Sequence, residues 1–310
     1  MSKIIFNQAI IMFILIALGA FCYKIKLINN DGNKQLTNLL LYIVNPVIVF
    51  NSYLMEFKQE LAVNLFYAFI LAVATHIIAM LISYIFIRNK KDDNGKTAIE
   101  RFSVIYTNCG FMGIPLLTAL FGQEGVFYAS AYLTVFNLLS WSHGYAMISG
   151  TKDKKTILKG ICSPVVFAVI LGLIFFFVQI PVPYIIKESV KHISSLNTPI
   201  AMIVLGVNLA QYNLLETFKK PRIYYVCLMG SLFVPTVLCF IYSLFPIPKT
   251  VILSNIIQAA CPCATVTLLF STKLNKNVEH ATSVVTMSNI ISIITIPIIT
   301  IVFDIFQKMF

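Results

Sequence analysis

Ten long apolar stretches recur along the 310-residue chain, and they constrain its fold more than any other feature. A helix of about 20 apolar residues crosses the roughly 30 Å of hydrocarbon in a bilayer. The stretches follow one another with short connections, so no segment remains for a soluble domain. The predicted membrane-spanning segments are 4–23, 34–55, 61–87, 99–121, 125–149, 161–180, 187–210, 222–246, 250–271 and 281–307.

The composition agrees with an all-α membrane protein. Hydrophobic residues make up 58% of the chain and charged residues 11%, whereas soluble domains carry about 25% charged residues. We interpret the first stretch as a retained helix, because its apolar run is too long for a signal-peptide core. The seven cysteines lie in apolar stretches, so we expect packed thiols rather than disulfides, and neither a metal site nor a cofactor.

Lysine and arginine are distributed unevenly between two sets of loops. The odd-numbered loops carry 17 of these residues and the opposite side carries 6. The positive-inside rule therefore predicts cytoplasmic odd-numbered loops and extracytoplasmic termini in a multi-pass protein of the plasma (inner) membrane. The net charge of +11 follows from this rule and needs no nucleic-acid partner, while the basic face should attract membrane lipid. The odd-numbered loops include Lys90, Lys91, Lys152, Lys154, Lys155 and Lys159.

The ten segments divide into two groups of five, residues 1–150 and 157–310. Because five is odd, the second group enters the membrane in the opposite orientation, which predicts an inverted repeat. Helix-breaking residues at matching positions of inverted halves indicate a transporter site near the middle of the membrane. Lone prolines that only kink a helix are the alternative, and we interpret Pro164, Pro235 and Pro297 in this way. The matching pairs are Asn45-Pro46 with Asn197-Thr198-Pro199, and 108–115 with 258–262.

Breaks in membrane helices offer chemistry for binding an anion. Each break starts a second half-helix inside the membrane, and Pro115 and Pro262 suit the first turn of such a helix. Helix N-termini bind negative charge through free N–H groups and the helix dipole. Charged residues are missing from the centres of the apolar segments, which disfavours a proton relay or a strong cation site. The candidate substrate-binding residues are Asn45, Pro46, Asn108, Cys109, Gly110, Gly113, Pro115, Gln258, Cys261, Pro262, Cys263 and Thr265.

Several other polar residues in the segments have two interpretations. His76 and His143 are compatible with proton coupling, because histidine titrates near neutral pH. We favour hydrogen-bonded packing histidines, since the sequence places no carboxylate near them. Ser288, Asn289 and Ser292 are interpreted as polar contacts between helices.

The motifs resemble those of the auxin efflux carrier family, which includes plant auxin exporters and bacterial permeases linked to malate or malonate. The run Met112-Gly113-Ile114-Pro115-Leu116-Leu117, preceded by Asn108, is similar to the fourth helix of that family. Pro262, followed by Phe270 and the polar stretch to Asn275, is similar to the ninth helix. Pro46 resembles the proline of the second helix, and 201–206 resembles the seventh helix. The resemblance covers essentially the whole chain.

This resemblance implies a ten-helix inverted-repeat fold related to that of the bile acid sodium symporters. A scaffold (about 1–56 and 157–212) would hold a mobile transport part (about 61–150 and 222–310), in which the broken helices four and nine cross. The resemblance also implies elevator-type movement, a homodimer, and a contact between Asn108 and a substrate carboxylate. The residues between Cys261 and Thr267 depart from the plant pattern, which disfavours an auxin-like substrate.

The sequence therefore predicts a permease for a small organic anion, with a carboxylate as the expected substrate, and not an enzyme. One negative charge gains about 2.3 kcal/mol per 100 mV on leaving a negative interior, so uncoupled export is physically sufficient. Sodium- or proton-coupled symport of a carboxylate or a bile-acid-like molecule is the alternative. A membrane sensor or a channel without alternating access is a hypothesis of another class, and two matched breaks would serve no purpose in it.

Overall fold

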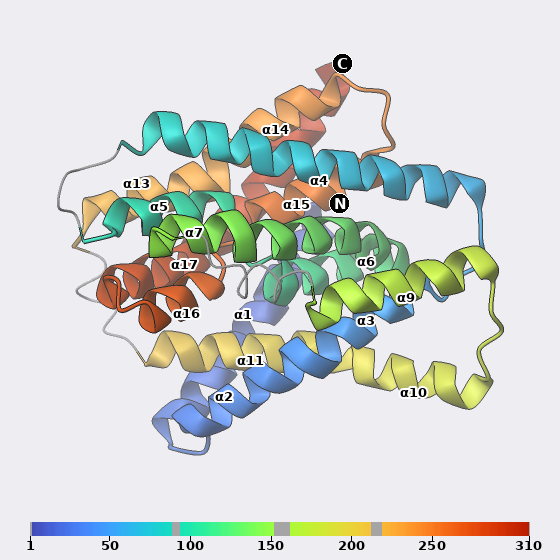
Figure 1. Ribbon diagram of the computed structural model, residues 1–310, viewed down its shortest axis with the longest axis horizontal. Helices are drawn as coiled ribbons and strands as arrows, with labels where there is room; N and C mark the ends of the chain where they lie inside the picture. The colour runs from blue at the N-terminus through green and yellow to red at the C-terminus, as the bar shows by residue number, and fades with distance from the viewer. Residues whose placement is uncertain (1, 89–93, 152–161, 212–218, 310) are drawn as a thin grey trace.

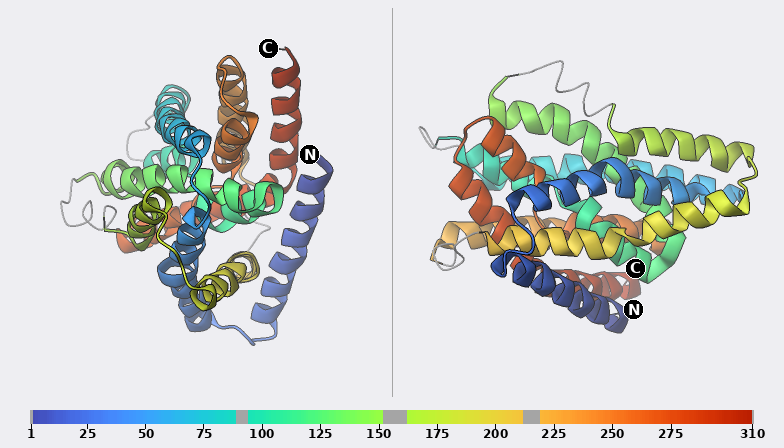
Figure 2. Two further views of the ribbon diagram at one scale, coloured as in Figure 1. Left: turned by 90° about the vertical axis from the view of Figure 1, so that its right-hand side faces the viewer. Right: turned by 90° about the horizontal axis from the view of Figure 1, so that it is seen from below.

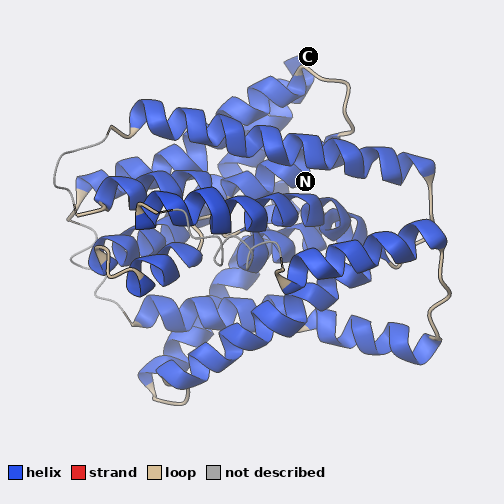
Figure 3. Ribbon diagram, in the orientation of Figure 1, coloured by secondary structure: helices blue, strands red, loops and turns tan. Residues whose placement is uncertain are grey.

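The computed structural model describes residues 2–88, 94–151, 162–211 and 219–309. These residues form helices and connecting loops, with one backbone bridge between Thr107 and Cys263 (Figure 3). The prediction of an all-α protein is therefore confirmed for the described part of the chain. The basic residues Lys90, Lys91, Lys152, Lys154, Lys155 and Lys159 lie outside the described residues.

The helices follow one another through the whole chain, and four short π-helical turns (η) interrupt them. The elements of the first half are α1 (Ser2–Lys24), α2 (Asn30–Leu39), η1 (Leu40–Val44), α3 (Asn45–Tyr53), α4 (Gln59–Phe86), α5 (Lys96–Ile105), η2 (Cys109–Gly113), α6 (Ile114–Leu139), η3 (Ser140–Gly144) and α7 (Tyr145–Ser149). Those of the second half are α9 (Pro164–Val178), α10 (Tyr184–Ser195), α11 (Asn197–Ala210), α13 (Pro221–Leu228), η4 (Met229–Phe233), α14 (Val234–Ser243), α15 (Lys249–Ala260), α16 (Val266–Lys273) and α17 (Val278–Met309).

The helix bundle has two ends, and successive helices run between them (Figure 1). The C-terminal end of α4 and the beginnings of α5 and α13 lie at the left-hand end in this view. The connections from α3 to α4 and from α9 to α10 lie at the right-hand end. At the edge of the bundle, α1 packs along α11 and also contacts α17 (Figure 2).

The helices α1 and α11 pack closely against each other, and two glycines make this contact possible. A methyl group at Gly19 would overlap the main chain of Ile203, and one at Gly206 would overlap the main chain of Ile16. Small residues allow membrane helices to approach until their main chains touch, which maximises van der Waals contact where no hydrophobic effect drives association. This contact ties the first helix to the second half of the chain.

Five helices in the described part of the chain are long and apolar enough to cross a membrane. They are Asn30–Tyr53, Gln59–Phe86, Tyr184–Ala210, Pro221–Ser243 and Val278–Met309. The predicted segments 99–121 and 250–271 are not among them, because each is interrupted between shorter helices. The helix α6 is kinked at Gly122, whose φ of 58° is readily adopted only by glycine.

Three of the four π-helical turns end two residues before a proline. Thus η1, η2 and η4 are followed by Pro46, Pro115 and Pro235 respectively. A proline inside an α-helix lacks an N–H donor, and its ring clashes with the carbonyl four residues earlier. The wider π turn lets the helix continue past the proline. Asn45-Pro46 therefore lies within a continuous helix. Asn197-Thr198-Pro199 begins α11, which follows α10 after the single residue Leu196 inside the span Tyr184–Ala210, so this pair does not lie at a break either.

Candidate functional site

Two short non-helical segments lie at the residues that the sequence singles out. The first, Tyr106 to Asn108, separates α5 from η2 and α6. The second, Cys261 to Ala264, separates α15 from α16. We call them the first and the second break.

The two breaks pair with each other as a minimal antiparallel ladder. The main-chain N–H of Asn108 donates to the carbonyl of Pro262 at 2.6 Å, and the N–H of Ala264 donates to the carbonyl of Tyr106 at 3.0 Å. Unpaired main-chain groups are costly where water is absent, so irregular backbone persists only where protein or a cavity satisfies it. The exchange explains how two interrupted helices lie against each other at low cost.

Side chains add two further bonds around the ladder. The hydroxyl of Thr107 donates to the carbonyl of Gln258 at 2.7 Å, and the N–H of Cys263 donates to the hydroxyl of Ser288 at 3.1 Å. Ser292 on the same helix lies 3.7 Å from the sulfur of Met112. The interpretation of Ser288 and Ser292 as polar contacts between helices is therefore confirmed. It is wrong for Asn289, whose Nδ2 donates to the carbonyl of Val285 in its own helix and whose Oδ1 has no partner among the described residues.

Asn108 is the most unusual side chain of the first break. It is 5% exposed, and its Nδ2 has no hydrogen-bond partner among the described residues. Its main-chain carbonyl accepts from the N–H groups of Met112 at 3.1 Å and Gly113 at 3.4 Å, and the second bond has the spacing of a π turn. A buried amide donor without a partner costs free energy, unless a ligand or water takes its proton.

Gln258, at the end of α15, faces the π turn that follows the first break. Its Nε2 donates to the carbonyl of Ala129 at 2.9 Å, whereas its Oε1 has no partner in the described part of the chain. A methyl group at Gly113 would lie 2.7 Å from that oxygen. Gly113 is therefore needed for the close approach of η2 to Gln258.

A pair of asparagines connects the two continuous proline-containing helices. Nδ2 of Asn197 donates to Oδ1 of Asn45 at 2.7 Å, and both residues are buried. A Cβ at Gly110 would lie 3.5 Å from Nδ2 of Asn45, which places the pair beside the first break. Oδ1 of Asn197 has no partner among the described residues. Asn197 was not among the predicted site residues, although its position opposite Asn45 in the second half was a usable signal.

Several predicted residues lie elsewhere than expected. Pro115 lies in the first turn of α6, as expected, although η2 precedes α6 without an interruption. Pro262 lies inside the second break, and α16 begins only at Val266, so the expectation is wrong for Pro262. Thr265 precedes α16, and its hydroxyl makes no capping bond.

The thiols near the breaks are engaged within the protein. Cys261 donates to the carbonyl of Ile257 at 3.3 Å, and the sulfur of Cys263 lies 3.1 Å from the hydroxyl of Thr267. Cys109 is buried. The three cysteines therefore act as packing groups in this conformation.

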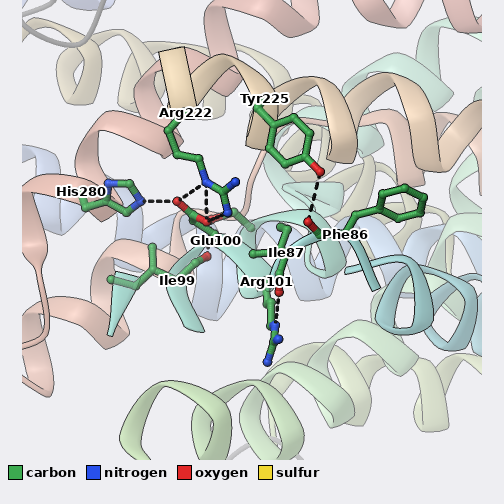
Figure 4. A network of polar contacts seen from close by, with 9 residues as sticks. Phe86, Ile87, Ile99, Glu100, Arg101, Arg222, Tyr225 and His280 are labelled. Carbon is green, nitrogen blue, oxygen red and sulfur yellow. Dashed lines mark hydrogen bonds and ion pairs between the residues drawn. The ribbon is translucent and has the colours of Figure 1, made fainter. Parts of the chain in front are cut away.

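An ion pair fixes α5, the helix that leads into the first break (Figure 4). The guanidinium of Arg222 on α13 contacts the buried carboxylate of Glu100, with an Nη2–Oε2 distance of 2.6 Å. Nε2 of His280 on α17 lies 3.2 Å from the other carboxylate oxygen. Arg101 donates to the carbonyl of Ile87 at 2.9 Å. The contacts of Glu100 hold α5 against α13 and α17 of the second half, and that of Arg101 holds it against the end of α4, so the start of the first break has a defined position.

The two histidines lie near Tyr106, the first residue of the first break. Nδ1 of His76 lies 2.7 Å from the carbonyl of Ala72, and its ring packs against Tyr106 and Tyr132. Nδ1 of His143 lies 2.9 Å from the hydroxyl of Tyr106. Both histidine rings therefore pack around Tyr106, at the start of the first break.

The comparisons with known proteins point to one class of membrane protein. The model of a family described as membrane transport protein matches residues 4–157 and 151–300. An uncharacterized transporter of Methanothermobacter thermautotrophicus is 22% identical over 293 residues, which cover 93% of this chain and 95% of that protein. An uncharacterized transporter of Methanocaldococcus jannaschii is 26% identical over 220 residues, which cover 66% of this chain and 68% of that protein.

Proposed function

Because the chain belongs to the membrane transport protein family, the family of the auxin efflux carriers, we propose that it is a secondary transporter for a small organic anion, with the two paired breaks as its substrate site. The family supports a membrane transporter in general. The choice of an anion rests on the chemistry of the breaks.

The observation that carries the choice of an anion is the unpartnered amide of Asn108. Its Nδ2 is a buried hydrogen-bond donor beside the start of a helix, where the helix dipole also favours negative charge. A carboxylate oxygen accepts from both kinds of donor. The described residues of the two breaks carry no charged side chain, so a substrate carboxylate would meet dipoles rather than a competing ion.

The proposed architecture has ten membrane-spanning segments in two inverted halves, with helices four and nine interrupted and crossing at the ladder. The scaffold would contain α1–α3 and α9–α11, and the transport part α4–α7 and α13–α17. The tight contact of α1 with α11 and the ladder between α5–α6 and α15–α16 support this division, because each lies within one proposed part. In an elevator-type cycle the transport part would move past the scaffold inside a homodimer in the plasma membrane, with both termini outside.

Transport in proteoliposomes tests the proposal, with Asn108→Ala as the decisive variant. Losing a hydrogen bond to a charged group costs about 1.5–3 kcal/mol, so substrate affinity should fall by roughly ten- to a hundredfold. Asn137→Ala is the matched control, because the side-chain amide of Asn137 donates to the carbonyl of Leu133 in its own helix. We expect the control to transport like the wild type.

The substrate for this assay comes from a thermal-shift screen of mono- and dicarboxylates, because a ligand raises the melting temperature of the state that it binds. Carboxylate flux that is equal in Asn108→Ala and the wild type would refute the assigned site. Flux that depends on a sodium or pH gradient would favour coupled symport over the uncoupled carrier.

A further inference from the structure

A cavity of about 220 Å³ lies between α3, α6 and α10, close to the asparagine pair. Ile48 in its wall follows Asn45 by three residues, and Ser194 precedes Asn197 by three residues. Residues three apart lie on one face of a helix, about one turn or 4.5 Å along its axis. The cavity therefore begins one helical turn from the asparagines that flank the first break.

The walls of this cavity offer few hydrogen-bond donors. The hydroxyls of Ser52, Thr118 and Ser194 each donate to a carbonyl of their own helix, at 2.6, 2.8 and 2.7 Å. Nε2 of Gln123 donates to the carbonyls of Asn51 and Leu54 at 2.7 and 3.2 Å. Because these protons are already used, the walls present mainly carbon atoms to an occupant, and the amide of Asn51 is a further polar group among them.

One positively charged side chain lines this largely apolar cavity. Lys191 is the only charged residue among the described residues that line the cavity. Its side chain is 70% exposed, and its Nζ lies 3.5 Å from Oε1 of Glu188. Exposed ion pairs of this kind contribute little, so the ammonium remains available to another anion.

A neighbouring cavity, which also has α10 as a wall, differs from the first in its charged residues. It has a volume of about 260 Å³, lies between α3, α9 and α10, and includes Lys187 in its wall. Glu56 lines it as well, so its carboxylate opposes the entry of an anion. All three helices belong to the proposed scaffold. Of the two, only the cavity with Lys191 also has α6 as a wall and lies one helical turn from the asparagine pair.

We propose that the cavity with Lys191 is the vestibule through which the organic anion reaches the breaks from one side of the membrane. This proposal rests on the proposed function and adds a substrate class to it. The Lys191 ammonium attracts one carboxylate, and the carbon-lined walls contact an apolar body. A second carboxylate would find no cation in the described walls. The vestibule therefore suits a monocarboxylate with a hydrocarbon or aromatic body better than a dicarboxylate.

Uptake of benzoate and succinate into proteoliposomes tests the substrate class. Lys191→Met should raise the KM for benzoate roughly tenfold and leave the maximal rate almost unchanged. The reason is that electrostatic steering changes how often the anion reaches the site, not the later steps of transport. The salt dependence of uptake should weaken in the same variant. Lys187→Met should transport like the wild type. A preference for succinate, or equal effects of the two lysine variants, would overturn the proposal.

A labelling experiment tests whether the cavity attracts anions, and it does not depend on a transport measurement. Ser195→Cys places a thiol in the exposed wall of the cavity, and Cys22→Ala and Cys162→Ser remove the native thiols that are not buried. A sulfonate-bearing methanethiosulfonate should modify this thiol faster than a trimethylammonium-bearing one. Lys191→Met should remove the difference, and Lys187→Met should keep it.

The two assays separate the two hypotheses. Equal labelling rates for the two reagents in the presence of Lys191 would refute the vestibule. Charge-selective labelling together with no uptake of either carboxylate would support an anion-attracting cavity and refute the carboxylate transport on which its role rests.

Discussion

The two breaks share one ladder of main-chain hydrogen bonds. They differ in whether their side chains have hydrogen-bonding groups without a partner. At the first break, Nδ2 of Asn108 is buried without a partner among the described residues. At the second break, Cys261 and Cys263 make contacts at 3.3 and 3.1 Å within the protein, and Ser288 accepts from the main chain. Under the proposed function, the first break would present the ligand-binding group, whereas the second would hold the first in place.

The two glycines of η2 test whether contacts from the second half position the first break, and they should give the largest effect. A methyl group at Gly113 would lie 2.7 Å from Oε1 of Gln258, whereas one at Gly110 would have its closest contact at 3.5 Å. Gly113→Ala should therefore destabilise the protein by about 1–3 kcal/mol through overpacking. It should also lower transport on the order of tenfold or more, because small displacements of binding groups are costly.

Gly110→Ala serves as the matched control, since it adds the same methyl group to the same turn. Thermal unfolding in detergent and flux in proteoliposomes are the two measurements. Equal behaviour of the two variants would show that the contact between η2 and Gln258 does not position the first break.

Ser288 tests the supporting role of the second break. Ser288→Ala removes the acceptor for the N–H of Cys263, and hydrogen bonds between membrane helices are worth about 0.6 kcal/mol on average and up to 1.7. We expect a lower melting temperature with little change in KM. Ser189→Ala is a suitable control, because the hydroxyl of Ser189 donates to the carbonyl of Ile185 in its own helix. A large rise in KM without loss of stability would instead make Ser288 a substrate contact.

The sequence was sufficient for the helical class and the family. Clusters of Gly and Pro such as 108–115 predict interrupted helices, because they have few other uses in an apolar segment. The partners of the breaks could not be predicted. The bond from Thr107 to the carbonyl of Gln258 joins residues 151 positions apart, and local patterns carry no information about that register. The π turns before Pro46 and Pro115 were missed for another reason, since a proline signals a disturbed helix but not how the helix absorbs it.

The smallest expected effect concerns Thr265, which the sequence placed in the substrate site. Its hydroxyl makes no capping bond to α16, although Thr is a good capping residue, and the side chain is partly exposed. Thr265→Val keeps the shape and removes only the hydroxyl, so stability should change by less than about 0.5 kcal/mol and the KM should stay at the wild-type value. A marked rise in KM would mean that the hydroxyl is left free for the substrate. The region of the second break would then contribute a substrate-binding group, as proposed for the first, and the functional difference between the two breaks would disappear.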